Sequence, residues 1–371
     1  MRVEMKPFRY PLARPSLPPS ARENLLRAYD SGWISSKGEF IKKFEDGFAS
    51  FVGDRHGVST SNGTTALHLA LAACGIRAGD EVIVPDFSFV AVANTVVYTG
   101  AKPVLADVNR RYWGLDADSV KARLSKKTKA VVVVHLYGHP VDIDPIRELC
   151  AANGLLLIED CAEAHGARYK GRMVGTFGDV ACFSFYGNKI LTTGEGGMCL
   201  TKDDRIESTM RLLRDHGALP SRHFWHPVVG FNYRMTNMQA AIGCAQLGSL
   251  DSRIRGYRRV GKWYTNMLSS AGLEPHPEMD WATCVYWMYT TMIEKLGPSG
   301  LANLAKRLER EGIETRPSFY PISELPPYRH MRYRNPTTAY LSRHGLSLPT
   351  YYGMAEEDVQ QVCSSLLKSI S

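Results

Sequence analysis

The chain has 371 residues, of which 44% are hydrophobic and 22% are charged, as is typical of a globular protein with a sizeable core. No apolar run reaches the roughly 18 residues of a membrane span, and the N-terminal stretch lacks the apolar segment of a signal peptide, so we expect a cytoplasmic protein with no membrane partner. The net charge of +8 would suit nucleic acid, a membrane surface or small anionic ligands. No nucleic-acid-binding motif accompanies this charge, and no nucleic-acid partner is expected.

The eight cysteines are scattered, mostly within apolar runs, and no C-x-x-C pair occurs. This spacing favours buried, reduced thiols over a disulfide framework, and we expect no metal site.

From about residue 55 to 205, short β-branched apolar runs alternate with helical stretches that often end in glycine. This alternation predicts an α/β fold with a mostly parallel sheet flanked by helices. The expected strands cover residues 81–87, 102–108, 130–138, 155–162 and 179–185.

The alternation loosens after residue 206. Helical patterns follow over residues 237–271, then an apolar run over 284–293 and an amphipathic helix over 300–312. We therefore predict a large domain of residues 1–249, which includes the N-terminal segment, and a smaller α+β domain of residues 250–371.

In an open parallel sheet, ligands bind where strands end and the next helices begin. One such position is "SNGTTALHLAL", where Gly63, Thr64 and Thr65 run directly into a helix. Free amides, hydroxyls and the positive end of the helix dipole suit a phosphate there, although a plain helix cap would have the same residues.

A second strand end is "LLLIED", with Glu159 and Asp160 after four apolar residues. A carboxylate in this position either caps the next turn or serves a ligand. Glu163 and His165 follow on the next turn, and we expect His165 to be a structural hydrogen-bonding residue.

The third strand end is "ACFSFYGNK", which places Ser184 in the strand and Lys189 just beyond it, before the glycine-rich "TTGEGG". Lys189 could grip a phosphate, act through its amine, or be a solvated lysine beside a turn. A P-loop requires the lysine after its glycines and a helix directly behind it, so the first interpretation fails. The dinucleotide motif G-x-G-x-x-G is also absent.

A phosphate cup, a strand-end carboxylate and a strand-end lysine together fit pyridoxal phosphate, with Phe87 or Phe89 as cover for its ring. The cofactor needs a lysine that bonds to it covalently and a carboxylate that keeps its ring nitrogen protonated. Burial and a cationic neighbour would lower the Lys189 pKa and make the amine reactive.

Segments along nearly the whole chain resemble the DegT/StrS-type sugar aminotransferases, which are fold-type I pyridoxal phosphate enzymes. They include "SGWISSKGEFIKKFEDGFASFVG", "PDFSFVAVANTV", "IEDCAEAHGA", "FGDVACFSFYGNKILTTGEGGM" and "HPVVGFNYRMTNMQAAIGCAQL". The resemblance implies that Lys189 bonds to the cofactor and Asp160 pairs with its ring nitrogen. It also implies that Phe89 covers the ring and that Glu163, where relatives often have Gln, lies beside the ring hydroxyl. Four residues would hold the phosphate: Gly63, Thr64, Thr65 and Ser184. Asn232 would reach the phosphate of a neighbouring subunit, in a homodimer with shared active sites.

Lys189 also separates this chain from a related branch that has His at this position and removes a sugar hydroxyl instead of transferring nitrogen. The closest resemblance is to the GDP-perosamine synthase branch. It implies transfer of nitrogen from L-glutamate to a nucleotide-linked 4-keto-6-deoxy sugar, best matched by GDP-4-keto-6-deoxymannose. Arg316 and Tyr320 would contact this substrate, while Ser323 stands where that branch often has His. Another keto sugar (dTDP- or UDP-linked, 3- or 4-keto), a keto-cyclitol, or a non-catalytic regulatory role are the alternatives.

Overall fold

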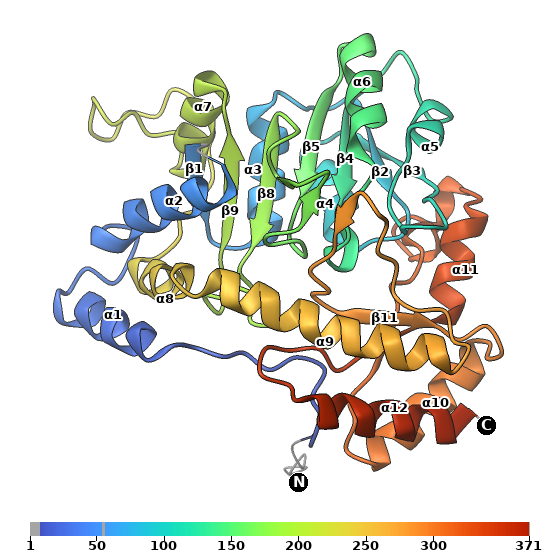
Figure 1. Cartoon of the computed structure of the whole chain (residues 1–371). Helices are drawn as coiled ribbons and strands as arrows, with labels where there is room; N and C mark the ends of the chain where they lie inside the picture. Colours follow the sequence, from blue (N-terminus) through green and yellow to red (C-terminus); the bar gives the residue numbers. More distant parts are fainter. Residues whose placement is uncertain (1–7, 54–55, 371) are drawn as a thin grey trace, which may run out of the picture.

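The computed structural model describes residues 8–53 and 56–370, and its central element is a seven-stranded sheet in the upper part of Figure 1. The strand order is β1-β9-β8-β5-β4-β2-β3, with bounds β1 (His56–Thr60), β2 (Glu81–Pro85), β3 (Lys102–Ala106), β4 (Thr128–Val134), β5 (Leu156–Asp160), β8 (Val180–Ser184) and β9 (Gly197–Thr201). Two small three-stranded sheets consist of β10 (Ala282–Thr283), β6 (Arg168–Tyr169) and β7 (Arg172–Met173), and of β11 (Tyr289–Met292), β13 (Gly345–Leu348) and β12 (Arg316–Pro317).

Helices cover the large sheet and build most of the lower part of the molecule (Figure 1). None of those found in the described ranges is long and apolar enough to cross a bilayer. The helices are α1 (Pro19–Asp30), α2 (Glu39–Val52), α3 (Gly63–Ala73), α4 (Ala91–Tyr98), α5 (Ala117–Lys121), α6 (Ile143–Asn153), α7 (Asp204–Arg214), α8 (Asn237–Leu247), α9 (Leu250–Ser270), α10 (Pro298–Arg310), α11 (Pro336–His344) and α12 (Glu356–Ile370), with 3-10 turns η1 (Leu136–Gly138), η2 (Ile322–Glu324) and η3 (Arg329–Met331).

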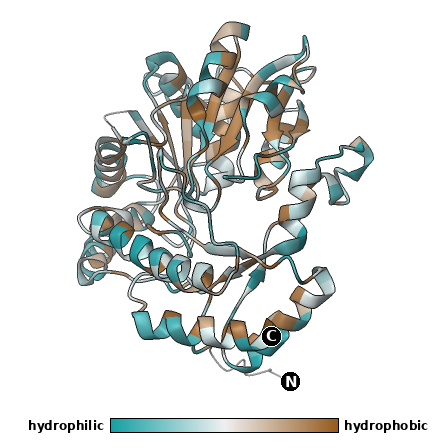
Figure 2. Cartoon of the chain, turned by 45° about the vertical axis from the view of Figure 1, so that its right-hand side comes forward, coloured by the Kyte–Doolittle hydropathy of each residue, from teal (hydrophilic) through white to brown (hydrophobic). Residues whose placement is uncertain are grey.

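The predicted α/β class is confirmed, and all five predicted strands are present with somewhat shorter bounds. Alternate residues of these strands enter different cores: Val82 and Val84 pack on one face of the sheet and Ile83 on the other. Both faces are therefore covered, which explains why the strands are apolar throughout and appear brown in Figure 2.

Two strands of the sheet, β1 and β9, were not predicted. β9 lies between β8 and β1 and runs antiparallel to both. Its first residue, Gly197, pairs with Ser184 of β8 on one side and with Thr60 of β1 on the other. Because β9 is antiparallel to both neighbours, β1 runs in the same direction as β8. The carboxyl ends of β1, β5 and β8 thus meet at one edge of the sheet.

A second core lies below the sheet, formed by α9, β11, α10, β13 and α12. Helix α9, which crosses under the sheet in Figure 1, contributes Ile254 and Tyr257 to the main core and Tyr264 and Leu268 to the second one. The domain boundary at residue 250 coincides with the start of this shared helix, and it stays a prediction.

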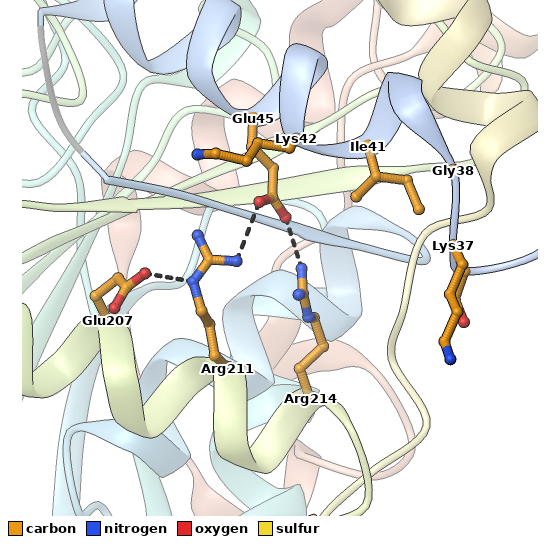
Figure 3. Close-up of a pocket in the computed structure, with 9 residues that line it drawn as sticks. Lys37, Gly38, Ile41, Lys42, Glu45, Glu207, Arg211 and Arg214 are labelled. Atoms are coloured by element: carbon orange, nitrogen blue, oxygen red, sulfur yellow. Dashed lines mark hydrogen bonds and ion pairs between the residues drawn. The ribbon is translucent and has the colours of Figure 1, made fainter. Parts of the chain in front are cut away.

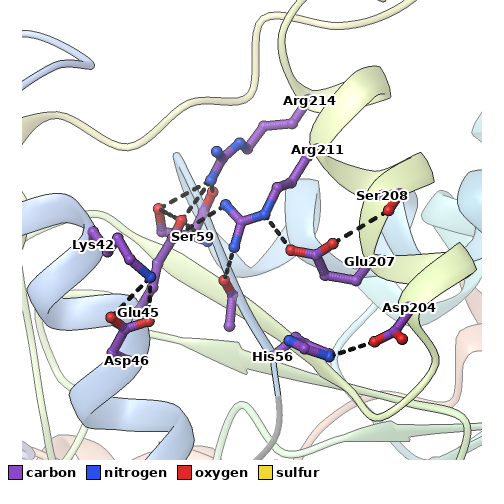
Figure 4. A network of polar contacts seen from close by, with 11 residues as sticks. Lys42, Glu45, Asp46, His56, Ser59, Asp204, Glu207, Ser208, Arg211 and Arg214 are labelled. Carbon is purple, nitrogen blue, oxygen red and sulfur yellow. Dashed lines mark hydrogen bonds and ion pairs between the residues drawn. The ribbon is translucent and has the colours of Figure 1, made fainter. Parts of the chain in front are cut away.

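A buried carboxylate joins the edge strand β1 to α2 and α7 (Figure 4). Glu45 accepts hydrogen bonds from Arg211 at 3.1 Å, Arg214 at 2.7 Å and the Ser59 amide at 2.9 Å. Burial raises the Glu45 pKa, but the two arginines and Ser59 more than offset this effect, and the net shift is downward. The ion pairs thus fasten the edge strand to its covering helices.

Candidate active site

The predicted site residues Asp160 and Ser184 lie at the ends of adjacent parallel strands. β5 pairs with β8 so that Asp160 is opposite Cys182, two residues before Ser184. Lys189 follows in a turn in which its amide donates to the Tyr186 carbonyl at 2.9 Å. The sheet therefore brings the carboxylate, the serine and the lysine to the same edge.

The Lys189 amine lies in a mostly buried position between a carboxylate and an aromatic ring. Its Nζ is 3.7 Å from Oε1 of Glu163 and 3.6 Å from the ring centroid of Trp287. Burial lowers the pKa of Lys189, against the opposing effect of Glu163 and Asp160. The lowered pKa makes the neutral, nucleophilic form of the amine easier to reach than in an exposed lysine, as expected from burial, although the charged neighbours are carboxyl groups and not the expected cation.

Asp160 is buried, and its Oδ1 accepts one hydrogen bond, from the Ala162 amide at 3.0 Å. Burial raises its pKa, although the Ala162 amide and the charge of Lys189 oppose this shift. The surrounding groups thus do not fully offset the cost of burying the Asp160 negative charge, and a cationic ligand group would stabilise the ionised form.

The neighbouring Glu159 has a different environment and acts as a structural residue. It accepts hydrogen bonds from the amides of Gly175, Phe177 and Gly178, each at 2.7 Å, and contacts His135 Nε2 at 3.1 Å. With Cys161, these two side chains form a cluster of ligand-type atoms within 4.8 Å of one another in the described part of the chain, but the Glu159 oxygens are already committed. Of the two strand-end carboxylates, Asp160 is the one available to a ligand.

Glu163 lies one turn beyond Asp160, beside Lys189. Its Oε2 accepts a hydrogen bond from the Tyr137 amide at 2.8 Å, while Oε1 faces the lysine. Burial raises the pKa of Glu163 to about 7, despite the opposing charge of Lys189. This side chain therefore changes charge near neutral pH.

His165 is enclosed by the rings of Phe48, Phe183 and Phe185. Burial lowers its pKa to about 3, so the imidazole is neutral. Neither ring nitrogen has a hydrogen bond of normal geometry within the described ranges. His165 therefore has the expected structural role: it packs in an aromatic cluster, and the Ser184 backbone lies beside its ring.

The start of α3 forms the predicted cup. Asn62 caps the helix by accepting from the Thr65 amide at 2.9 Å, and its own amide donates to the Thr65 hydroxyl at 3.1 Å. This capping box engages Thr65, whereas the Gly63 and Thr64 amides are not used by Asn62. A Cβ on residue 63 would lie 2.7 Å from Ser184 Cβ, so glycine allows the helix start to approach the serine.

The remaining predicted residues lie farther from this centre or at its surface. The Phe89 side chain is 56% exposed, and its ring centroid is 6.0 Å from that of Phe319. Asn232 is exposed; its Oδ1 accepts from Arg234 at 2.9 Å. In the part of the chain that is described, no hydrogen bond joins Asn232 to the residues around Lys189.

Of the two predicted substrate contacts, Arg316 forms an exposed ion pair with Glu314 at 3.4 Å. Tyr320 is 64% exposed and follows Phe319, whose ring stacks on Tyr137 at 5.4 Å and an interplanar angle of 5°. Tyr320 is thus next to a residue, Phe319, that packs on Tyr137 beside the site, whereas Arg316 is paired with Glu314.

Two further features of the site were missed. Trp287 was part of an apolar run that only predicted a buried segment, and nothing in its spacing indicated contact with Lys189. Asp86, at the end of β2, accepts from the amide and hydroxyl of Ser323, both at 2.7 Å, and from Asn335 at 2.8 Å. Ser323 therefore fastens the segment that carries Phe319 and Tyr320 to the end of β2.

An open pocket of about 440 Å³ lies elsewhere, over the Glu45 network (Figure 3). It contains none of the predicted site residues; its lining is Ser36, Lys37, Gly38, Ile41, Lys42, Glu45, Glu207, Arg211 and Arg214. Its arginines are already paired with Glu45 and Glu207, which makes it a structural feature of this face.

The donor set around Lys189 fits pyridoxal phosphate. The under-compensated Asp160 suits a protonated ring nitrogen, the contact of Gly63 with Ser184 forms a narrow cradle at a helix start, and Lys189 supplies an amine of lowered pKa.

A model of the DegT/DnrJ/EryC1/StrS aminotransferase family matches residues 17–367. The chain belongs to this family. It is 46% identical over 362 residues to GDP-perosamine synthase from Caulobacter vibrioides, covering 96% of this chain and 97% of that protein. It is 42% identical over 358 residues to GDP-perosamine synthase from Vibrio cholerae, covering 96% and 98%. A solved aminotransferase, TlmJ from Streptoalloteichus hindustanus, superimposes with a TM-score of 0.91 at 32% identity over 97% of this chain and 98% of that one. Membership of the family makes this chain a pyridoxal-phosphate-dependent sugar aminotransferase.

Proposed function

We propose that the enzyme transfers the amino group of L-glutamate to C4 of GDP-4-keto-6-deoxymannose, giving GDP-perosamine and 2-oxoglutarate. The observation that carries this proposal is the similarity to proteins named GDP-perosamine synthase, at 41–46% identity over 96% of the chain. The net charge of +8 suits a diphosphate-linked substrate.

Bound pyridoxal phosphate supplies an electron-withdrawing ring and a carbon that carries nitrogen from donor to acceptor. Asp160 would form an ion pair with the protonated ring nitrogen, and the Gly63 and Thr64 amides and Ser184 hydroxyl would bind the phosphate. Lys189 would move the proton between the cofactor carbon C4′ and C4 of the sugar. Glu163 lies close enough to hold the lysine amine in place during this transfer.

We further propose a cytoplasmic homodimer in which Asn232 binds the cofactor phosphate of the partner subunit. In support, the eight cysteines form no disulfide bonds in the part of the chain that the structure describes, as is usual in a reducing compartment. The segment after α7, which extends outward in Figure 1, exposes Phe224 by 84% and Val229 by 90%, and such apolar surface is typical of an interface.

The first test is a panel of nucleotide-linked keto sugars offered to enzyme that L-glutamate has converted to its amino form, with return of the cofactor absorbance as readout. We expect the GDP-linked 4-keto-6-deoxy sugar to react fastest. A faster dTDP- or UDP-linked sugar, or a keto-cyclitol, would contradict the substrate proposal but not the transaminase chemistry.

Lys189→Ala tests the chemistry itself. We expect turnover to fall below detection, because the nucleophile and the proton carrier are lost together, while the melting temperature stays near that of the wild type. Transamination that survives in the variant would refute the role of Lys189.

A further inference from the structure

Trp287 lies directly against the reactive amine, although it comes from the segment between α9 and β11. The side chain is buried, and the centre of its indole ring is 3.6 Å from Lys189 Nζ. This is within the range of a cation–π contact, in which the ring face attracts an ammonium group.

The indole is fixed from two sides. Its Nε1 donates to the carbonyl of Asn188, the residue before Lys189, at 2.8 Å. Its ring is roughly parallel to that of Tyr137, at 6.5 Å between centroids and 18° between planes. The same side chain therefore holds both the main chain before the lysine and the end of the lysine side chain.

The close approach of this segment depends on a glycine. Gly138 has φ +95°, and its carbonyl accepts from the Val285 amide at 3.0 Å. A Cβ at residue 138 would lie 2.7 Å from the Val285 side chain and 3.1 Å from the Trp287 amide. The turn after β4 is thus shaped to admit the backbone that carries the indole.

Three titratable groups also face Lys189, all from the turn after β5 or from its end. Glu163 is 3.7 Å from the amine, Asp160 attracts its charge, and the neutral His165 lies nearby. The two carboxyl groups favour the ammonium form, and the indole face adds to this preference from the opposite segment.

We propose that Trp287 is a positioning residue for Lys189: its indole face holds the ammonium form of the lysine beside Glu163 until the proton is lost and the amine bonds to the cofactor. The hydrogen bond to Asn188 keeps the turn in the matching conformation. This inference rests on the bond between Lys189 and pyridoxal phosphate, and it is independent of the identity of the sugar.

The test is the capture of pyridoxal phosphate by full-length enzyme from which the cofactor has been removed. The neutral Lys189 amine adds to the aldehyde carbon, and water leaves as the C=N bond forms, so the capture rate follows the neutral fraction of the amine. We would measure this rate by absorbance from pH 6 to 10 in the wild type, Trp287→Leu, Trp287→Phe and the control Trp281→Phe, with melting temperatures as the check on folding. Trp281 packs on Tyr112 and Tyr169, away from the lysine.

Loss of the ring face in Trp287→Leu should shift the midpoint of the rate profile to lower pH by about half a unit or more, since the ammonium is less stable. The plateau rate should fall several-fold because the amine is no longer held in place. Trp287→Phe keeps a ring face but loses the bond to Asn188, so its midpoint should move less while its plateau still falls. Trp281→Phe should match the wild type.

A folded Trp287→Leu protein with the wild-type midpoint and plateau would overturn the proposal. If that variant does not fold, a Trp287→Phe protein with an unchanged plateau rate overturns it equally. A wild-type protein that captures no pyridoxal phosphate would instead refute the transaminase chemistry, so the two failures are distinguishable.

Discussion

Asp160 and Glu163 are two buried carboxyl groups with different tasks beside one lysine. Asp160 has a single hydrogen bond and lies at the strand end, where a cofactor ring nitrogen would meet it. Glu163 is tied to the Tyr137 amide and faces the lysine amine. Although only three positions apart in the chain, Asp160 would act on the cofactor ring and Glu163 would hold the lysine amine.

Glu163→Gln should change how stability depends on pH. The pKa of Glu163 rises from 4.5 to about 7 on folding, so the folded state binds more protons than the unfolded chain between these values. Stability from this group is therefore present below about pH 4.5 and is lost as the pH rises to about 7.

The glutamine variant should not show this loss and should gain about 1–3 kcal/mol relative to the wild type on going from pH 5 to pH 8. Denaturant titrations of the cofactor-free proteins at both pH values would measure it, with the exposed Glu357→Gln as control. Equal pH dependence in all three proteins would mean that Glu163 is ionised throughout this range.

At the scale of the element, the start of α3 is placed by its contact with the end of β8. Gly63→Ala would put a methyl group 2.7 Å from Ser184 Cβ, and the helix start or the strand end must then move. We expect the dissociation constant of pyridoxal phosphate to rise by about tenfold, or about 1.4 kcal/mol. Fluorescence titration of cofactor-free enzyme measures this constant.

Gly248→Ala is the matched control, because an added Cβ there meets no atom within 4 Å. If the two alanine variants bound the cofactor equally well, the Gly63 contact would have no part in shaping the phosphate cup.

The fastening of the C-terminal segment to Asp86 gives a second prediction for an element. Ser323→Ala removes one donor from a buried carboxylate and should lower the free energy of unfolding by about 1–2 kcal/mol. The KM for the nucleotide sugar should rise as well, because Phe319 and Tyr320 lie just before this anchor. The exposed Ser364→Ala should stay within about 0.5 kcal/mol of the wild type; an equally small effect of Ser323→Ala would show that Asn335 and the Ser323 amide suffice.

The sequence allowed prediction of those features that depend on local pattern. Strands β2, β3, β4, β5 and β8 are long apolar runs, and knowledge that parallel strands end at one edge was enough to bring Asp160 and Lys189 together. Strands β1 and β9 were not predicted because their sequences, "HGVST" and "GMCLT", contain glycine and small polar residues that weaken a strand pattern. Trp287 and Asp86 were missed because their partners lie far away in the chain, and only the fold brings them into contact.

For the whole molecule, the proposed shared-site dimer makes a sharp prediction. Asn232→Ala should weaken cofactor binding, and Lys189→Ala should be inactive. Refolded or exchanged mixtures of the two should recover part of the activity, because one site of each hybrid dimer combines an intact Lys189 with the partner's intact Asn232.

Sedimentation would check that each variant alone remains dimeric. Mixtures whose activity at limiting cofactor stays at the average of the two separate variants, in a sample shown to contain hybrids, would place Asn232 in its own subunit's site or outside any site.

The carboxylates at the carboxyl ends of the parallel strands have different partners, depending on the position of the strand in the sheet. Asp160, on an inner strand, is available to the cofactor, whereas Asp86 and Asp107, on the outer strands β2 and β3, bind the segment from Ser323 to Thr338. That segment must therefore travel with the sheet during any opening of the enzyme. Entry of a bulky nucleotide sugar then requires movement of other parts of the molecule.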